Sequence, residues 1–299
     1  MSVEPGWLEP RPAEPPPDQP IVPEAVPAAQ PRRRHLRSLR HEVRSRLLEA
    51  RAIERLPPER FGFSVPSATR LFVITSVLYR WYFRTRCFGL DNLPSSPFML
   101  VSNHASHVLS WDGANIVTAC LLDAEPPRLV HAMAEHRLMG LPILGRAARR
   151  IGAVDGTRPA CVDLLRGSAV VLTFPEGVRA LARPFRDRYR MAPFGLGFVH
   201  VALETGVPIV PVAVIGAEEE APLLANPAWL RRLLRTPVAP ITPTLFVPLP
   251  VRYRLHFGAP LRISGPGTPD CVAREAGRVR RALEDLIRHG LARREHLFV

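Results

Sequence analysis

The sequence has 299 residues, of which 46% are hydrophobic and 22% charged, and its formal net charge is +13. This length and apolar fraction exclude a chain that is disordered throughout. The four cysteines are far apart and form no C-x-x-C pair, which excludes a disulfide scaffold and predicts no zinc site. All forty basic residues are arginine, so nucleic acid, an anionic membrane or an anionic substrate would suit the charge.

Residues 1–31 predict a disordered, proline-rich acidic tail. They contain ten prolines, and residues 1–30 hold five acidic side chains against one arginine. Such a composition cannot bury enough apolar surface to fold. The segment also lacks the basic start and apolar run of a signal peptide, so we expect no secretion.

Residues 32–66 predict an arginine-rich amphipathic helix and a linker. Ten arginines stand against four glutamates in residues 32–60, while apolar side chains recur at helical spacing at Leu36, Leu39, Val43 and Leu47. Two interpretations remain open: the helix packs on the domain, or it contacts a membrane surface.

Residues 67–90 predict a helix that is first apolar and then aromatic, with arginines beside the rings. Arg70 and Arg80 bound the apolar run, which is shorter than the roughly 20 residues needed to span a bilayer. We therefore expect no transmembrane helix here. The segment suits either the membrane interface or a buried position against the domain.

From residue 97 onward, short strand-like runs alternate with helical stretches. The runs with strand character are 98–101, 169–174, 209–215 and 252–257, whereas 197–204 and 268–289 have helical patterns. This alternation predicts one α/β domain over residues 67–299. We expect a sandwich built on a mixed, mostly parallel sheet flanked by helices.

Candidate catalytic residues follow the first of these strands. His104, His107 and Asp112 lie within the loop that leaves residues 98–101. A histidine can act as a general base near neutral pH, and a carboxylate can orient its ring. Loops at strand ends are where α/β folds usually carry such groups.

A second candidate site follows residues 169–174. The sequence there is Phe174-Pro175-Glu176-Gly177 and continues to Arg179. Proline and glycine favour a turn, which leaves the glutamate and the arginine where a buried strand ends. Taken alone, the same pattern fits an ordinary turn whose glutamate is solvated.

Together, the two sites resemble the phospholipid/glycerol acyltransferase superfamily. The resemblance rests on the histidine and aspartate of the first loop, on Phe174-Pro175-Glu176-Gly177, and on the later run Val207-Pro208-Ile209-Val210-Pro211-Val212. Residues 188–189, 194–195 and 214–219 are similar to the bacterial branch that resembles monoacylglycerol acyltransferases. The resemblance covers about residues 70–265 and implies the same α/β fold.

The first loop departs from the usual pattern of the superfamily, which is His, four residues, Asp. His107 has this spacing to Asp112, but Asn103 precedes His104, as the asparagine precedes the histidine in the closest branch. The resemblance favours His104 as the base, with His107 as the rival by spacing. The choice depends on which ring has Asp112 on its second nitrogen.

The resemblance implies transfer of a fatty acyl group from acyl-CoA or acyl carrier protein to a hydroxyl of a glycerolipid. It assigns the acceptor side to Phe174, Pro175, Glu176, Gly177 and Arg179. Arg179 would bind either an acceptor phosphate or only Glu176. A further arginine of the acceptor side corresponds to Arg158. No metal and no cofactor beyond the acyl donor are implied, and no covalent acyl-enzyme is needed.

Other functions remain open at this point. An irregular first loop is compatible with an inactive lipid-binding or scaffold protein of the same fold. The arginine-rich segment 32–60 is compatible with a nucleic-acid binder, but no zinc finger or RNA-recognition motif is present. We therefore expect an enzyme held peripherally at the cytoplasmic face of an anionic membrane, with no nucleic-acid partner.

Overall fold

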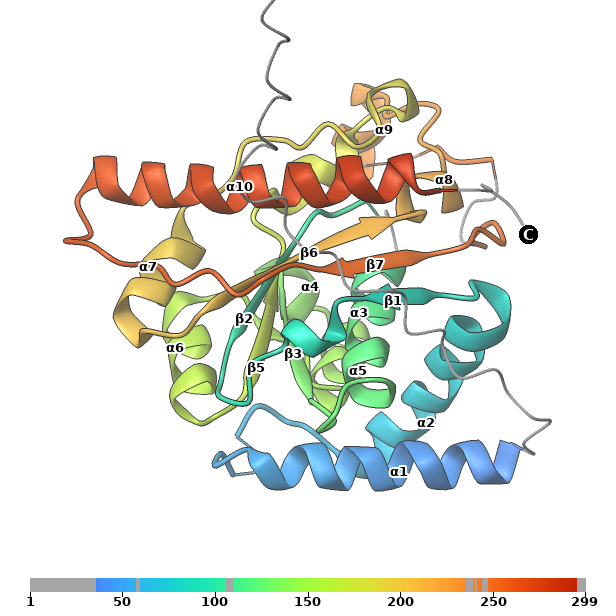
Figure 1. Ribbon diagram of the computed structural model, residues 1–299. Helices are drawn as coiled ribbons and strands as arrows, with labels where there is room; N and C mark the ends of the chain where they lie inside the picture. Colours follow the sequence, from blue (N-terminus) through green and yellow to red (C-terminus); the bar gives the residue numbers. More distant parts are fainter. Residues whose placement is uncertain are drawn as a thin grey trace, which may run out of the picture.

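The computed structural model describes residues 36–57, 60–105, 110–234, 239, 241–243 and 247–294 (Figure 1). The predicted tail at residues 1–31 and the rival base His107 lie outside these ranges. A wide sheet forms the centre of the molecule, and the two longest helices, α1 (Leu36–Ile53) and α10 (Pro269–Ala292), lie on opposite sides of it.

Seven strands make up the sheet of the described residues, in the order β1-β7-β6-β2-β5-β3-β4. They are β1 (Arg86–Phe88), β2 (Met99–Ser102), β3 (Val130–Ala134), β4 (Val154–Asp155), β5 (Val170–Thr173), β6 (Ile209–Ile215) and β7 (Arg254–Phe257). The β6–β7 pair is antiparallel and the other pairs are parallel. The predicted mixed, mostly parallel sheet is confirmed. Strands β1, β3 and β4 were not expected from the sequence, because they are short or lie within less distinctive apolar stretches.

The two faces of the sheet are covered by different helices, because successive strand residues point to opposite sides. Met99 and Val101 of β2 pack with α6 (Arg158–Arg166), α7 (Gly197–Thr205) and α10. Leu100 packs on the other face with α3 (Trp111–Leu122) and the π-helical turn η1 (Leu78–Tyr82). Every residue of β2 and β6 is buried, as expected for strands covered on both faces.

The remaining elements are short and lie mostly in the connections. They are α4 (His136–Met139), α5 (Leu144–Arg150), α8 (Ala217–Glu220) and α9 (Ala228–Leu234), with the 3-10 turns η2 (Leu90–Asn92), η3 (Gly177–Ala182) and η4 (Phe185–Asp187).

Helix α1 packs its apolar face on the domain, which is the first of the two interpretations given above. Leu39, Val43 and Leu47 are buried in a cluster with α2 (Val65–Val77) and the end of α3. Arg46 donates to the backbone oxygens of Leu121, Leu122 and Ala124, which fixes α1 to the end of α3. Because this apolar face is covered, it is not free to enter a membrane.

The predicted single helix over residues 67–90 is wrong after residue 82. Helix α2 passes into η1, which ends at Tyr82 with Phe83 as its C-cap, and strand β1 begins at Arg86. Arg84 has a φ of 46°, which ends the helical path. Tyr79 and Phe83 are buried in the core below the sheet, so these aromatic rings serve packing. Among the described residues, no helix is both long enough and apolar enough to cross a membrane.

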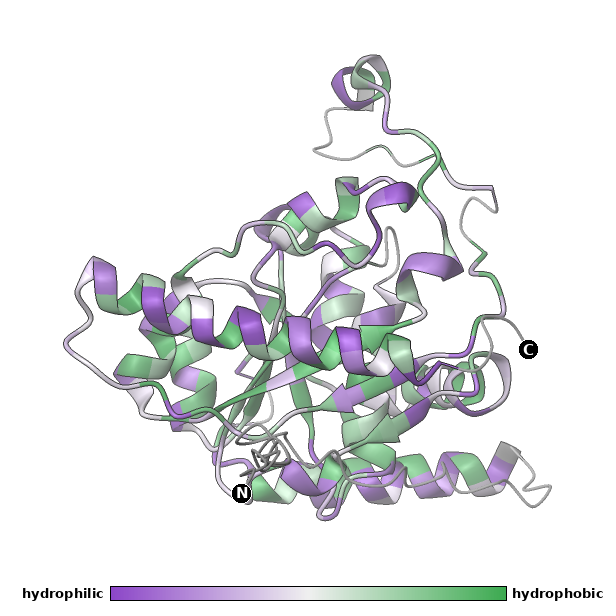
Figure 2. Ribbon diagram, turned by 45° about the horizontal axis from the view of Figure 1, so that its top comes forward, coloured by the Kyte–Doolittle hydropathy of each residue, from purple (hydrophilic) through white to green (hydrophobic). Residues whose placement is uncertain are grey.

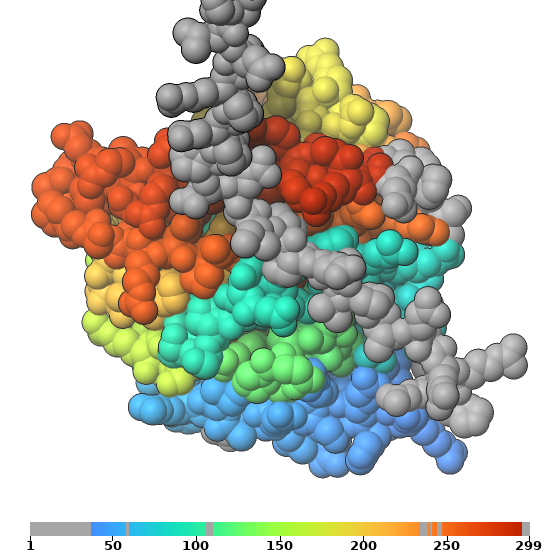
Figure 3. Space-filling view, in the orientation of Figure 1, coloured from blue at the N-terminus to red at the C-terminus, as the bar shows by residue number. Residues whose placement is uncertain are grey.

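The predicted C-terminal helix is present as α10. Thr268 stands at its N-cap position and Pro269 at its first turn, where a missing N–H costs nothing. Val279 and Leu283 are fully buried, and the helix runs across β6 and α7. Figure 2 shows hydrophilic and hydrophobic residues alternating along α1 and α10, and Figure 3 shows the outer side of both helices at the molecular surface.

Candidate active site

The two predicted site segments meet at one edge of the sheet. Strands β2 and β5 are parallel neighbours, with Leu100 beside Leu172. The segments that follow them, 103–105 and 174–177, therefore leave the sheet together at its carboxyl edge. Strand pairing alone thus brings the histidine and the glutamate motifs side by side.

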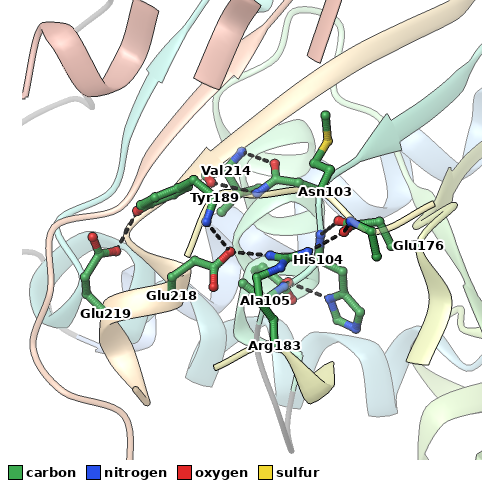
Figure 4. A network of polar contacts seen from close by, with 12 residues as sticks. Asn103, His104, Ala105, Glu176, Arg183, Tyr189, Val214, Glu218 and Glu219 are labelled. Atoms are coloured by element: carbon green, nitrogen blue, oxygen red, sulfur yellow. Dashed lines mark hydrogen bonds and ion pairs between the residues drawn. The ribbon is translucent and has the colours of Figure 1, made fainter. Parts of the chain in front are cut away.

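Asn103 fixes the start of the first loop. Its side-chain amide donates to the carbonyl oxygen of Val214 at 3.0 Å, and its side-chain oxygen accepts from the Val214 N–H at 2.8 Å. Val214 belongs to β6, the other neighbour of β2. The buried side-chain amide thereby pairs with β6 as the backbone of a neighbouring strand would. This contact anchors Asn103, the residue directly before His104 (Figure 4).

His104 and Asp112 form a close pair. Nδ1 of His104 lies 2.6 Å from Oδ2 of Asp112, whose side chain is fully buried. The carboxylate also accepts hydrogen bonds from Ala105 N–H at 2.9 Å, from Gly113 N–H at 2.7 Å and from the Ser110 hydroxyl at 3.0 Å. These partners lie around the first turn of α3, where the helix dipole stabilises a negative charge.

The electrostatics of this pair determine where the imidazole proton lies. Burial by itself would raise the pKa of Asp112, but the His104 charge and the hydrogen bonds from His104, Ala105 and Gly113 lower it below its ordinary value. Asp112 is therefore a carboxylate, which can only accept, and Nδ1 of His104 must donate. The lone pair of a neutral ring then lies on Nε2, which has no hydrogen-bond partner among the described residues.

Phe174 holds the other side of the imidazole. Its ring stacks on His104 with centroids 4.2 Å apart and an angle of 24° between the planes. Gly113 keeps the start of α3 close to this stack, because a Cβ there would lie 2.8 Å from the Ser110 hydroxyl oxygen and 3.5 Å from the Phe174 ring. The ring of His104 is thus fixed by a carboxylate on its edge and by an aromatic face.

Glu176 is buried, so the expectation that it lines the acceptor side is not what the structure shows. Its side chain is fully inaccessible. One oxygen accepts from the His104 backbone N–H at 3.2 Å, and the other accepts from the Ala192 N–H at 2.5 Å and from Arg183. Glu176 therefore joins the loop after β5 to the loop after β2 and positions the backbone of the histidine.

Arg183 and Glu218 are site residues that were not expected from the sequence. The buried guanidinium of Arg183 bridges Glu176 and Glu218, and Glu218 also accepts from the Tyr189 N–H at 3.0 Å. Burial raises the pKa of Glu218 even though Arg183 opposes this shift. A signal was present: three glutamates directly after a wholly apolar strand require buried partners.

A parallel contact extends the network beyond Glu218. The Tyr189 hydroxyl donates to Glu219 at 2.5 Å and accepts from the Gly216 N–H at 2.9 Å. Arg294, after the end of α10, binds the same Glu219 at 2.8 Å. Figure 4 shows these contacts continuing from the histidine loop through Arg183 to α8.

The other predicted site residues are placed differently. Arg179 is exposed and has no ion pair with a described residue, and the alternative that it binds Glu176 is wrong because Arg183 takes that place. Gly177 is exposed with a φ of 59°. The Pro175 carbonyl accepts from the Gly195 N–H at 2.7 Å.

Arg158 is not brought to the histidine and glutamate loops. It lies at the start of α6 and donates two hydrogen bonds to Glu204 of α7, at 3.0 and 2.8 Å. More than half of the Arg158 side chain is exposed. Its contacts in the structure are those of an ion pair between two helices on the surface.

Among the described residues, no group of three or more histidine, cysteine, aspartate or glutamate side chains is arranged to hold a metal ion. The site as described consists of a buried carboxylate, a histidine with one free ring nitrogen, a supporting ion-pair network and one unpaired exposed arginine. This set suits proton transfer at Nε2 of His104.

These loops lie within the part of the chain that matches a known protein family. The Acyltransferase family model matches residues 84–215, a stretch that contains His104, Asp112, Glu176 and Arg183. It begins just before β1 and ends with β6.

The chain is also similar to individual proteins. An uncharacterized protein of Mycobacterium tuberculosis is 36% identical over 192 residues, which are 61% of this chain and 53% of that protein. A Gallus gallus protein named as a DGAT1/2-independent enzyme synthesizing storage lipids is 27% identical over 202 residues, 67% of this chain and 58% of its own length. The chain thus spans about half the length of the curated relatives it matches.

One solved structure extends the similarity to the fold. The crystal structure of the 1-acyl-sn-glycerophosphate (LPA) acyltransferase PlsC from Thermotoga maritima matches with a TM-score of 0.55 at 18% identity. The match covers 77% of this chain and 81% of that one. At this identity the likeness concerns the arrangement of strands and helices.

Proposed function

We propose that this chain, whose residues 84–215 match the Acyltransferase family model, transfers a fatty acyl group to a hydroxyl of a glycerolipid. The donor is a thioester, either acyl-CoA or acyl carrier protein. The acceptor is a lysophospholipid, glycerol phosphate or monoacylglycerol. The enzyme acts peripherally at the cytoplasmic face of a membrane.

The observation that carries the proposal is the His104–Asp112 pair, with Nδ1 and Oδ2 2.6 Å apart. Nε2 of His104 accepts the proton of the acceptor hydroxyl as that oxygen attacks the thioester carbonyl. Asp112 holds the ring in the required tautomer and stabilises the imidazolium that forms. An inactive scaffold would have no need of a buried carboxylate held by four donors behind an imidazole whose Nε2 has no partner among the described residues.

The second half of the reaction returns the proton. Collapse of the tetrahedral intermediate breaks the carbon–sulfur bond, and the leaving thiolate takes the proton from Nε2 of His104. The products are the new ester and the free thiol, and His104 is regenerated. Because a thioester is already activated, the acyl group passes directly from donor to acceptor without an acyl-enzyme.

Arg179 is proposed to face the acceptor. It is exposed, follows the turn at Gly177 and has no ion pair with a described residue, so its guanidinium is available for two parallel hydrogen bonds to a phosphate. The names of two similar proteins point to different lipids, because one is named for synthesizing storage lipids and the other as a 1-acyl-sn-glycerophosphate acyltransferase. A test with acceptors that carry or lack phosphate separates them.

The catalytic assignment is tested by three variants, assayed with acyl-CoA and a panel of lysophospholipids and monoacylglycerol. We expect His104→Ala to lower kcat by at least about a hundredfold, because general-base catalysis contributes that much or more. Asp112→Asn should also lower kcat strongly, because an amide no longer fixes the imidazole tautomer. His107→Ala serves as the control and should retain turnover.

If His104→Ala kept near wild-type turnover and His107→Ala lost turnover, the general base would be His107. No turnover of the wild-type protein on any acceptor, with either thioester donor, would favour the inactive scaffold. Selective binding of DNA without binding of lipid would favour a nucleic-acid binder.

A further inference from the structure

Four large apolar side chains are exposed together on one short connection. Leu138 is 40% exposed, Leu141 46%, Ile143 82% and Leu144 55%. They belong to residues 137–150, which run from α4 through a short connection into α5 and which we call the α4–α5 knuckle. Single exposed apolar residues are common on protein surfaces, but a contiguous group of this kind usually marks an interaction site.

The backbone of the α4–α5 knuckle is held in a tight turn. A Cβ on buried Gly145 would overlap the carbonyl of Met139, so only glycine allows α4 and α5 to approach this closely. The Gly145 N–H donates to the Leu141 carbonyl at 2.9 Å, and Arg149 donates to the Met139 carbonyl at 2.8 Å. Met139 is the side chain that turns inward, and its exposed apolar neighbours remain presented to the outside.

The charge beside these side chains is positive. Residues 135–150 contain four arginines and one acidic residue, Glu135. Arg137, Arg146 and Arg150 are exposed and have no ion pair with a described residue. Apolar side chains surrounded by unpaired guanidinium groups complement an acyl-chain region covered by anionic headgroups.

The α4–α5 knuckle lies at the same edge of the sheet as the candidate active site. Strand β3 is parallel to β5, with Ala132 beside Leu172. The segment after β3, which begins α4, therefore leaves the sheet at the edge from which Phe174 and Glu176 emerge. An acceptor lipid held in a bilayer at this edge would lie on the side of the sheet from which the histidine loop also emerges.

We propose that the α4–α5 knuckle is the surface by which this protein docks on an anionic lipid bilayer. Leu141, Ile143 and Leu144 enter below the headgroups, while the three arginines bind lipid phosphates. This proposal rests on the proposed function for its choice of occupant, but docking itself does not require catalysis. It places the membrane contact on the α4–α5 knuckle and not on α1, whose apolar face is buried.

The test is sedimentation of the full chain with vesicles of phosphatidylcholine containing phosphatidylglycerol, over a series of lipid concentrations. We expect Ile143→Ser/Leu144→Ser to raise the lipid concentration for half-maximal binding by about tenfold or more, because two large apolar side chains no longer leave water. Since both side chains are exposed, the fold should be unaffected. The matched control is Leu48→Ser/Ile74→Ser, which changes side chains exposed by 48% and 55% on α1 and α2 and should bind as the wild type does.

A second variant tests the electrostatic part. Arg137→Gln/Arg146→Gln/Arg150→Gln should weaken binding to anionic vesicles by about fivefold for each arginine near the surface. It should leave the weaker binding to pure phosphatidylcholine vesicles unchanged. Turnover on a detergent-solubilised acceptor should be retained in both α4–α5 knuckle variants, because neither changes the histidine loop.

Unchanged vesicle binding by Ile143→Ser/Leu144→Ser would overturn the proposal. The proposal would also fail if the α4–α5 knuckle variants bound vesicles fully while another surface variant lost binding. Such a variant could be Leu48→Ser/Ile74→Ser, or Trp229→Ser/Leu233→Ser on α9. Loss of affinity for an acidic acyl carrier protein without loss of vesicle binding would assign the surface to that protein. If the wild-type protein showed no turnover but its vesicle binding still depended on the α4–α5 knuckle, the docking proposal would stand and the proposed function would fail.

Discussion

At the scale of single residues, two carboxylates support one histidine in different ways. Asp112 binds the ring of His104, and Glu176 binds its backbone N–H. Asp112 has its pKa lowered, whereas the next carboxylate in the network, Glu218, has its pKa raised by burial. Arg183 is the one cation that compensates both Glu176 and Glu218 within the described residues.

Replacement of Arg183 should therefore be costly. Arg183→Met leaves two buried carboxylates without their cation and should lower the free energy of unfolding by about 3–5 kcal/mol. Equilibrium unfolding in urea measures this difference. Arg186→Met, which changes a side chain 85% exposed in the same segment, is the control and should change stability little. An Arg183→Met protein as stable as the wild type would show that the ion pairs do not hold the loops.

Arg179 should affect substrate binding and leave stability unchanged. We expect Arg179→Gln to raise KM about tenfold for acceptors that carry a phosphate, because it removes charged hydrogen bonds. The KM for monoacylglycerol should stay the same. Steady-state kinetics on matched acceptor pairs measure both values, and an equal change for the two acceptor classes would contradict a phosphate-binding role.

At the scale of elements, α1 shows how an amphipathic pattern can be used. Its arginine-rich sequence suits a membrane surface as well as a protein surface. In the fold, its apolar residues pack on α2 and α3, and two of its arginines form ion pairs: Arg46 binds Glu125, and Arg51 binds Glu54. Glu54, directly after the helix, also binds the buried His131 of β3 at 2.8 Å, so the helix is tied to the sheet as well.

Adjacent leucines on α1 give a direct measure of this packing. Leu47 is fully buried and Leu48 is 48% exposed. We expect Leu47→Ala to lower the free energy of unfolding by about 2–5 kcal/mol, because it removes buried methyl groups and leaves a cavity. Leu48→Ala should change it by less than about 0.5 kcal/mol. Similar values for the two variants in urea unfolding would mean that α1 does not pack on the domain in solution.

At the scale of the whole molecule, the direction of the strands organises the chemistry. Strands β2, β5 and β3 are parallel neighbours, so the histidine loop, the glutamate loop and the α4–α5 knuckle leave the sheet at one edge. The long helices α1 and α10 stabilise the layers around that sheet and lie away from each other (Figure 1). Arg183 is a buried, paired arginine of this fold. Arg137 and Arg179, on segments that leave the sheet at this edge, are exposed and have no ion pair with a described residue.

The sequence by itself determined the mixed α/β sheet, because apolar runs such as residues 209–215 must be buried on both faces. It also placed the histidine and glutamate motifs at strand ends. It could not determine that Glu176 is buried against Arg183, or that the aromatic residues after α2 belong to the core. Those outcomes depend on contacts between residues distant in the chain. Only the register of parallel strands and the packing of helices on them decide which side chains meet.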